Sequence, residues 1–350
     1  MSCKPHEILA SVARAVCVTL VCILLPSCFL RAPDYTLVTH SYQRTRLGEK
    51  SFTSYDSQSF PYRKFLSSRT NAPALRTVVI GIHGFCGASI DYENLGHWLM
   101  QHQPEIGLYA YDVRGQGFDP LVERRGDIDN PQHWYRDLTT FTELVRRRHP
   151  SANIVWQGES MGALILSHTY RHELAEARTP PCDAIIITSP VVTTKNGLAP
   201  WKKEGVRLMA RAFPYQRVSI DALSGGEKIS MTSTSTHQDQ SDINSWNIER
   251  HTLRLLSNLG TLIDQMPECA QSFQVPTLIV HGGKDFFATP QQVHWFYQQI
   301  PPSVRKKRLF YPSSHHLLMY DTQKQQVLAD ITQWLTQLPA SPQLEASSYK

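Results

Sequence analysis

The stretch Asn153-Ile-Val-Trp-Gln-Gly-Glu-Ser-Met-Gly-Ala-Leu-Ile-Leu166 holds a Gly-x-Ser-x-Gly motif between two apolar runs. The first run, residues 153–156, is typical of a buried β-strand, and the second, residues 163–166, of a helix. A Gly-x-Ser-x-Gly motif between a strand and a helix is typical of a sharp turn that lifts the serine hydroxyl clear of a sheet. The start of the following helix favours negative charge beside that hydroxyl. The stretch therefore predicts a nucleophilic Ser160 at the edge of a sheet.

Apolar runs of the same kind recur on both sides of this stretch. They cover residues 77–82, 106–111, 184–187, 277–280 and 308–311. Residues with helical spacing lie between them, such as Trp134, Leu138, Phe141 and Val145. Strands without polar alternation are buried on both faces, and strands that alternate with helices form parallel sheets. The sequence thus predicts an α/β fold with a mostly parallel central sheet and helices on both faces.

Composition and charge exclude several classes of protein. The chain has 350 residues, of which 41% are hydrophobic, so it can bury a core. Its 35 basic and 30 acidic residues give a net charge of +5, and the basic residues are scattered, so no nucleic-acid partner is expected. His168 and His172 have helical spacing but lack the glutamate of a zinc-protease motif, so no metal is expected. No organic cofactor is implied either.

The chain divides by composition into a core and an insertion. Residues 58–190 and 251–338 are predicted to form the two parts of the core, residues 29–57 a linker with an edge strand, and residues 339–350 a tail. Residues 191–250 are too long for a connection within a compact sheet, which predicts an inserted lid. An amphipathic segment of this lid is expected either to line an acyl pocket or to pack on the core. Its apolar residues are Trp201, Val206, Leu208, Met209, Ala212 and Phe213.

The first 28 residues have the pattern of an export signal. Lys4 and Arg14 precede an apolar run over residues 15–25, which is shorter than the about 20 residues that a membrane span needs. Leu25-Pro-Ser-Cys28 resembles the bacterial lipobox, although Pro26 is unusual there. We expect lipidation of Cys28 and anchoring in the bacterial cell envelope. An uncleaved signal anchor and an ordinary cleaved signal are the alternatives.

Three cysteines, Cys86, Cys182 and Cys269, remain in the predicted mature chain. An odd number without a Cys-x-x-Cys pair supports neither a zinc site nor a disulfide framework. An oxidising compartment would allow one bridge, and the sequence does not select its two members.

A second segment that suits a nucleophilic serine is His83-Gly-Phe85, directly after the buried run 77–82. An oxyanion hole needs two backbone N–H groups that point at one position. Met161, the residue after the serine, should supply one of them, and the His-Gly turn would bring the Phe85 N–H to the same place. We expect His83 to be a structural residue of this turn rather than a base.

Two further segments carry an acid and a base. Asp285 follows the run 277–280 in Gly282-Gly-Lys-Asp285, where it can hold a histidine at the carboxyl edge of the sheet. His315 and His316 follow the last predicted strand. The order Ser160, Asp285, His316 is that of a Ser-Asp-His triad on an α/β sheet.

From about residue 58 to 338 the sequence resembles the α/β-hydrolases, in particular their monoacylglycerol lipase and lysophospholipase branch (serine aminopeptidase-like, Hydrolase 4). Besides the motifs above, the resemblance rests on Tyr111-Asp-Val-Arg-Gly-Gln-Gly117, Arg125-Gly-Asp127 and Asp137-Leu138. In this family the catalytic histidine lies five residues after a strand-end tyrosine and five before an acidic residue. Tyr311 and Asp321 match His316 in this way, so we expect His316 rather than His315 to be the base.

The resemblance implies a serine hydrolase that forms an acyl-enzyme. Its expected substrate is a small lipid-like ester, either a monoacylglycerol or a lysophospholipid. A short-chain carboxylesterase or an aminopeptidase would share every catalytic residue. A non-catalytic envelope binding protein on the same scaffold is the alternative from another class, and the intact serine, aspartate and histidine argue against it.

Overall fold

The computed structural model describes residues 35, 42–68, 74–193, 200–219 and 228–339. The predicted signal, with Cys28, lies outside the described residues, as do residues 340–350 of the predicted tail.

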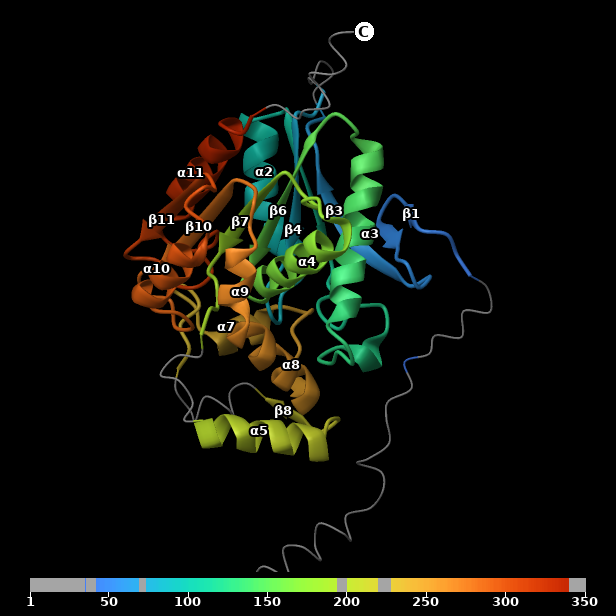
Figure 1. The fold of residues 1–350 in the computed structure, drawn as a ribbon, viewed down its shortest axis with the longest axis vertical. Coiled ribbons are helices and arrows are strands. Elements are labelled where there is room, and N and C mark those ends of the chain that lie inside the picture. Colours follow the sequence, from blue (N-terminus) through green and yellow to red (C-terminus); the bar gives the residue numbers. More distant parts are fainter. Residues whose placement is uncertain (1–34, 36–41, 69–73, 194–199, 220–227, 340–350) are drawn as a thin grey trace, which may run out of the picture.

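The centre of the molecule is a nine-stranded sheet (Figure 1). Its strands are β1 (Arg46–Leu47), β2 (Ser51–Thr53), β3 (Ser59–Phe65), β4 (Thr77–Ile82), β5 (Ile106–Tyr111), β6 (Asn153–Glu159), β7 (Ala184–Thr188), β10 (Thr277–Gly282) and β11 (Lys306–Tyr311), in the spatial order β1-β2-β3-β5-β4-β6-β7-β10-β11. All pairs from β5 to β11 are parallel, and β1, β2 and β3 pair antiparallel at one edge. The predicted α/β class is therefore confirmed.

Helices cover both faces of this sheet (Figure 1). One face carries α2 (Glu93–His102) and α11 (Lys324–Thr336), and the other carries α3 (Gln132–Arg148), α4 (Met161–Ala177), α9 (Met266–Gln271) and α10 (Pro290–Gln299). Short 3-10 segments, η2 (Ser89–Tyr92) and η3 (Val122–Arg124), follow β4 and β5.

The strands alternate their side chains between two apolar clusters. In β4, Val78, Ile80 and Ile82 belong to the cluster under α3 and α4, whereas Val79 belongs to the cluster under α2 and α11. All six residues of β4 are buried. A strand that is buried on both faces reads as an uninterrupted apolar run, which is why residues 77–82 stand out in the sequence.

A cap covers the carboxyl ends of the parallel strands (Figure 1). It consists of α5 (Pro200–Ala212), β8 (Arg217–Ser219), α7 (His237–Ile243), β9 (Arg250–Thr252) and α8 (Leu253–Asp264). β8 pairs with β9, and α8 packs against both α5 and the core helix α4. Thr252 and Arg254, at the start of α8, donate hydrogen bonds of 2.6 and 2.7 Å to the buried Asp127, which fastens the cap to the core.

The orientation of α5 differs from the expectation for the amphipathic segment. Leu208 and Met209 are 66% and 50% exposed, and Arg207 of the same helix faces inwards to the cavity described below. The expectation that Leu208 and Met209 line an acyl pocket is therefore wrong, because α8 lies between most of α5 and the sheet. The side chains of Trp201 and Val206 lie outside the described residues.

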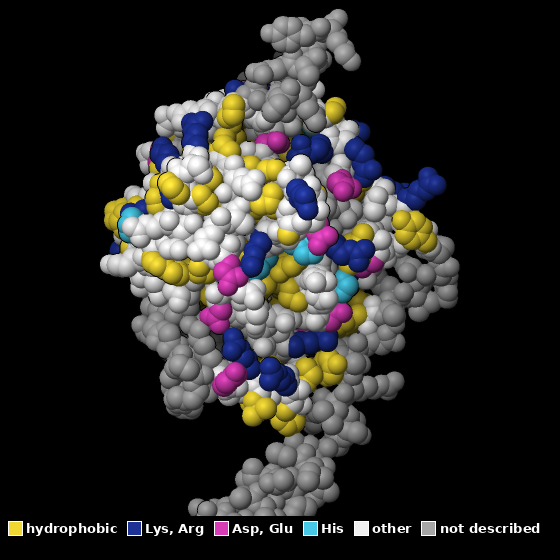
Figure 2. All heavy atoms as spheres, in the orientation of Figure 1, with side chains coloured by type: hydrophobic (Ala, Val, Ile, Leu, Met, Phe, Trp, Pro, Cys, Tyr) yellow, Lys and Arg dark blue, Asp and Glu magenta, His cyan; other side chains and the backbone are white. Residues whose placement is uncertain are grey.

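Other features of the described part of the chain bear on the sequence expectations. None of its helices is both long and apolar enough to cross a membrane. Cys86, Cys182 and Cys269 form no disulfide with one another. On the face shown in Figure 2, Lys and Arg side chains are interspersed with Asp and Glu.

Candidate active site

Ser160 lies on a sharp turn between β6 and α4. Its φ of 53° and ψ of −112° place it in a sparsely populated backbone region with positive φ, which costs a non-glycine residue on the order of 1–3 kcal/mol. The Ser160 N–H donates a hydrogen bond of 3.0 Å to the carbonyl of Thr188 at the end of β7, which holds the turn against the sheet. The strained serine of the Gly-x-Ser-x-Gly motif is thus present as predicted.

The two glycines of the motif are required by close backbone approach. A Cβ atom on Gly158 would lie 2.4 Å from the carbonyl oxygen of Gly162, and one on Gly162 would lie 1.9 Å from the carbonyl oxygen of Ile82. Neither side chain could be accommodated without moving α4 away from the sheet. The spacing of the motif therefore follows from the packing of the turn.

His316 and Asp285 come from loops after β11 and β10 and meet at the same edge of the sheet. The Nδ1 atom of His316 donates to Oδ2 of Asp285 at 2.8 Å, and each side chain is 2% exposed. The other oxygen of Asp285 accepts from the Phe287 N–H at 2.8 Å, which fixes the carboxylate. Burial lowers the pKa of His316, but the charge and hydrogen bond of Asp285, with a contribution from Glu159, outweigh burial and raise the pKa above its ordinary value.

His315 points to a different carboxylate. Its Nδ1 lies 2.9 Å from Oδ2 of Asp321, and its backbone N–H donates to the same oxygen at 2.6 Å. Asp321 also accepts from the backbone N–H of Ser233 in the cap and of Thr322. The structure therefore brings His316, and not His315, to Asp285.

The turn after β4 lies directly against Ser160. A Cβ atom on Gly84 would be 3.3 Å from Cβ of Ser160, so the turn that carries Phe85 lies beside this serine. Among the described residues, neither the Phe85 N–H nor the Met161 N–H has a hydrogen-bond acceptor. His83 is fully buried, with Nε2 accepting from the Val113 N–H at 3.0 Å and Nδ1 2.9 Å from the Gly84 carbonyl.

The Tyr-Asp-x-Arg-Gly-x-Gly loop after β5 braces this turn. Gln116 accepts a hydrogen bond of 3.1 Å from the Cys86 N–H, and Asp112 accepts from the N–H of Ser89 at 3.0 Å. Arg114 makes a two-pronged ion pair with the buried Asp137 of α3, with both N···O distances 2.7 Å. The motif thus positions the Phe85 turn relative to the sheet and α3.

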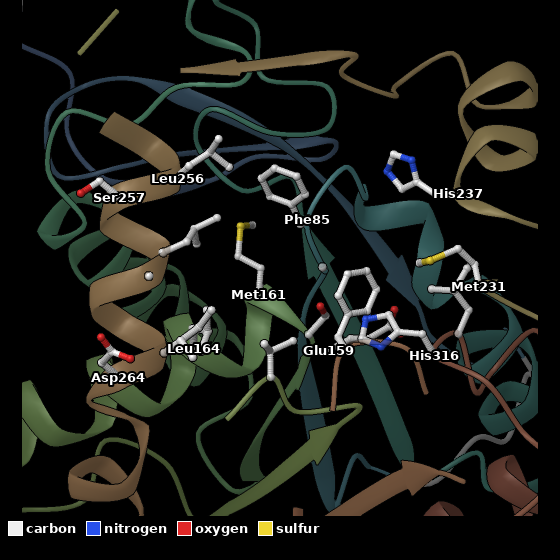
Figure 3. A pocket seen from close by; sticks show the side chains of 18 of the residues that line it. Phe85, Glu159, Met161, Leu164, Met231, His237, Leu256, Ser257, Asp264 and His316 are labelled. Carbon is white, nitrogen blue, oxygen red and sulfur yellow. The ribbon is translucent and has the colours of Figure 1, made fainter. Parts of the chain in front are cut away.

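Ser160 and His316 line one cavity of about 350 Å³. Its walls are mostly apolar and come from the core, through Phe85, Met161 and Leu164, and from the cap. Figure 3 shows Leu256 of α8 across the cavity from His316. A mostly apolar cavity of this size with a few polar groups is typical of a small-molecule site.

A second cavity of about 170 Å³ adjoins the first. The two share lining residues, among them Gly84, Phe85 and Glu159, so they meet beside Ser160. Burial raises the pKa of Glu159 to about 7, with Asp285 adding to the rise and His316 opposing it. Figure 3 shows Glu159 next to His316.

Two parts of this site were missed in the sequence. Glu159 occupies a variable position of the Gly-x-Ser-x-Gly motif, where the pattern itself gives no role to the side chain. The helix α8 supplies much of the apolar wall, and its amphipathic spacing was the available signal.

His168 has a structural contact, because its Nε2 lies 2.9 Å from the Leu262 carbonyl. The described residues contain no group of three or more potential metal ligands.

Comparison with known proteins gives a consistent assignment. The family model described as Hydrolase_4, serine aminopeptidase S33, matches residues 73–323. The monoacylglycerol lipase of Mycolicibacterium smegmatis is 23% identical over 264 residues, which are 74% of this chain and 88% of that protein.

Solved structures of lipases and esterases share the fold. A soluble variant of monoglyceride lipase from Saccharomyces cerevisiae aligns with a TM-score of 0.66 at 18% identity, over 89% of this chain and 100% of that chain. A thermostable carboxyl esterase from Bacillus coagulans aligns with a TM-score of 0.67 at 16% identity, over 83% and 98%. At such identities these two structures establish the fold alone.

The mostly parallel sheet with a serine on its strand-to-helix turn is that of an α/β-hydrolase. Together with this fold, the family match and the lipase relative identify the protein as a serine ester hydrolase of this class. Because the family model spans more than half of the sequence, the chain belongs to the Hydrolase_4 family, the serine aminopeptidases S33.

Proposed function

We propose that this enzyme hydrolyses carboxylic esters of small lipid-like molecules, monoacylglycerols or lysophospholipids, with Ser160, His316 and Asp285 as its catalytic triad. The observation that carries the proposal is the position of Ser160 and the Asp285-bound His316 on one largely apolar cavity. Such a cavity suits a fatty acyl chain, since burial of each methylene contributes about 0.8 kcal/mol.

The hydrogen bonds of the site support the following reaction. Because Nδ1 of His316 donates to Asp285, Nε2 is left as the acceptor for the Ser160 proton. Oγ of Ser160 attacks the ester carbonyl, and the N–H groups of Phe85 and Met161 stabilise the oxyanion. His316 then protonates the departing alcohol, and the acyl-enzyme is hydrolysed by a water molecule that His316 deprotonates.

Substrate profiling tests this proposal. Purified enzyme is assayed on 1-monoacylglycerols, lysophospholipids, p-nitrophenyl esters and aminoacyl anilides, with and without prior treatment by a fluorophosphonate. We expect the highest kcat/KM on a lipid-like ester and complete loss of turnover after fluorophosphonate treatment. A preference for aminoacyl anilides would contradict the proposal in favour of an aminopeptidase, and turnover that survives the fluorophosphonate would contradict a serine mechanism.

Gly260 of α8 provides a test of where the acyl chain binds. It lines the larger cavity, and a Cβ atom at this position would have no heavy atom within 4 Å. Gly260→Phe should fill part of the cavity and lower the ratio of dodecanoyl to butanoyl ester turnover by at least about tenfold. Gly260→Ala should keep the ratio near that of the unmodified enzyme.

A matched control is Gly205→Phe on the cap helix α5. Gly205 is exposed, and a Cβ atom there would also have no heavy atom within 4 Å, but Gly205 does not line the cavity. An equal change of the chain-length ratio in Gly205→Phe and Gly260→Phe would show that the larger cavity does not hold the acyl chain.

We also propose that Cys28 is lipidated and anchors the enzyme in the cell envelope. The support is the Leu25-Pro-Ser-Cys28 sequence after a short apolar run. Cys28→Ser should release the protein from the membrane fraction of the expressing bacterium. Mass spectrometry of the mature N-terminus is the direct measurement, and cleavage at another residue with no acyl group on Cys28 would refute the anchor.

A further inference from the structure

The smaller cavity contains a buried carboxyl group without a partner. Glu159 is only 4% exposed, yet no described residue donates a hydrogen bond to its carboxylate. The group lines both cavities beside Ser160. Because this side chain lines a cavity rather than the packed core, its oxygens are available to a ligand that enters beside Ser160.

The other lining residues of the smaller cavity give it an acidic character. Among the described residues, Asp91, Glu93 and Glu159 line it, and no Lys or Arg does. Burial raises the pKa of Asp91 to about 8, and the nearby Glu159 adds to the rise, so the two carboxyl groups interact. Trp246 also lines the cavity, and its buried indole N–H has no acceptor among the described residues.

These groups suit one kind of ligand. A hydroxyl group can accept from the Trp246 N–H and donate to Glu159, and an ammonium group can pair with the carboxylates. An anionic group would lose its hydration without any lysine or arginine to compensate, and it would be repelled by ionised Glu159 or Asp91.

We propose that the smaller cavity binds the alcohol part of the ester, and that Glu159 and Asp91 select alcohols that are uncharged or carry an ammonium group over alcohols that carry a phosphate or sulfonate. The inference rests on the proposed ester hydrolysis at Ser160. It narrows the substrate class to monoacylglycerol-like esters, because the phosphate of a lysophospholipid lies on the alcohol part.

The test uses three substrates whose alcohol parts differ in charge. They are the octanoyl esters of choline, ethylene glycol and isethionate, whose alcohol parts are cationic, neutral and anionic. The kcat/KM of each ester is divided by its rate constant for alkaline hydrolysis, which removes differences in leaving-group reactivity. In the unmodified enzyme we expect the choline and glycol esters to be preferred over the isethionate ester.

Two variants locate the origin of this preference, and they are assayed at pH 9, above the raised pKa of both Glu159 and Asp91, so that both carboxyl groups are ionised. Glu159→Gln should lower the ratio of choline to isethionate ester turnover on the order of tenfold, which is about 1.4 kcal/mol. Asp91→Asn should also lower the ratio of choline to isethionate ester turnover, and it serves as the test if Glu159→Gln fails to fold. The control is Glu143→Gln on α3, which removes an equal charge at an exposed position outside the cavity.

Three results would overturn the subsite. The first is a preference of the unmodified enzyme for the isethionate ester. The second is an unchanged ratio of choline to isethionate ester turnover in both Glu159→Gln and Asp91→Asn. The third is an equal change of this ratio in the control Glu143→Gln. Failure of the proposed function looks different, since the unmodified enzyme would then hydrolyse none of the three esters.

Discussion

Ser160→Ala is expected to reduce ester turnover by on the order of 10³-fold or more and to abolish labelling by a fluorophosphonate. The substitution removes the only atom that would bond to the acyl group, and it leaves the N–H groups of Phe85 and Met161 in place. These two donors should maintain a weak residual activity above the rate in water. The measurements are initial rates on a p-nitrophenyl ester and gel detection of a fluorescent fluorophosphonate.

The fold and stability of this variant should be unchanged. Alanine and serine both carry a Cβ atom, so the positive φ at position 160 costs both about equally, and Oγ of Ser160 donates no hydrogen bond to another described residue. Circular dichroism and a thermal melt therefore serve as controls. Labelling of Ser160→Ala at the rate of the unmodified enzyme would mean that another residue is the nucleophile.

The sequence indicated the fold correctly because its strands are buried on both faces. Residues 77–82 and 106–111 coincide with β4 and β5. A short apolar run without polar alternation is typical of a strand that is buried on both faces, and it differs from the helical spacing found elsewhere in the chain. The antiparallel strand β3 was less visible, because exposed residues such as Arg63 and Lys64 interrupt its apolar pattern.

The parts that the sequence did not reveal depend on tertiary contacts. Whether Leu208 and Met209 face the cavity is decided by the position of α8, which lies far along the chain from the start of the cap. The role of Glu159 depends on its neighbour Asp91 from another segment, and no local pattern links the two. Motifs that fix the backbone are read from the sequence more readily than side chains that meet across the fold.

His316→Ala is expected to lower turnover on the order of 10³-fold or more, whereas His315→Ala should lower it by less than about tenfold. The two histidines are neighbours in sequence, but their side chains contact different aspartates. His316 donates to Asp285 and lines the cavity with Ser160, so its loss would remove the proposed base for the serine proton. His315 instead contacts Asp321.

The small effect expected for His315→Ala follows from the other contacts of Asp321. The backbone N–H groups of residue 315, Ser233 and Thr322 all donate to this carboxylate, and none of them is removed with the imidazole. The loop that carries His316 should therefore keep its conformation. Each variant is assayed on the same p-nitrophenyl ester after circular dichroism has confirmed its fold. If His315→Ala were the more damaging variant, the assignment of His316 as the base would be wrong, because a side chain held on Asp321 reaches Ser160 only after the loop has rearranged.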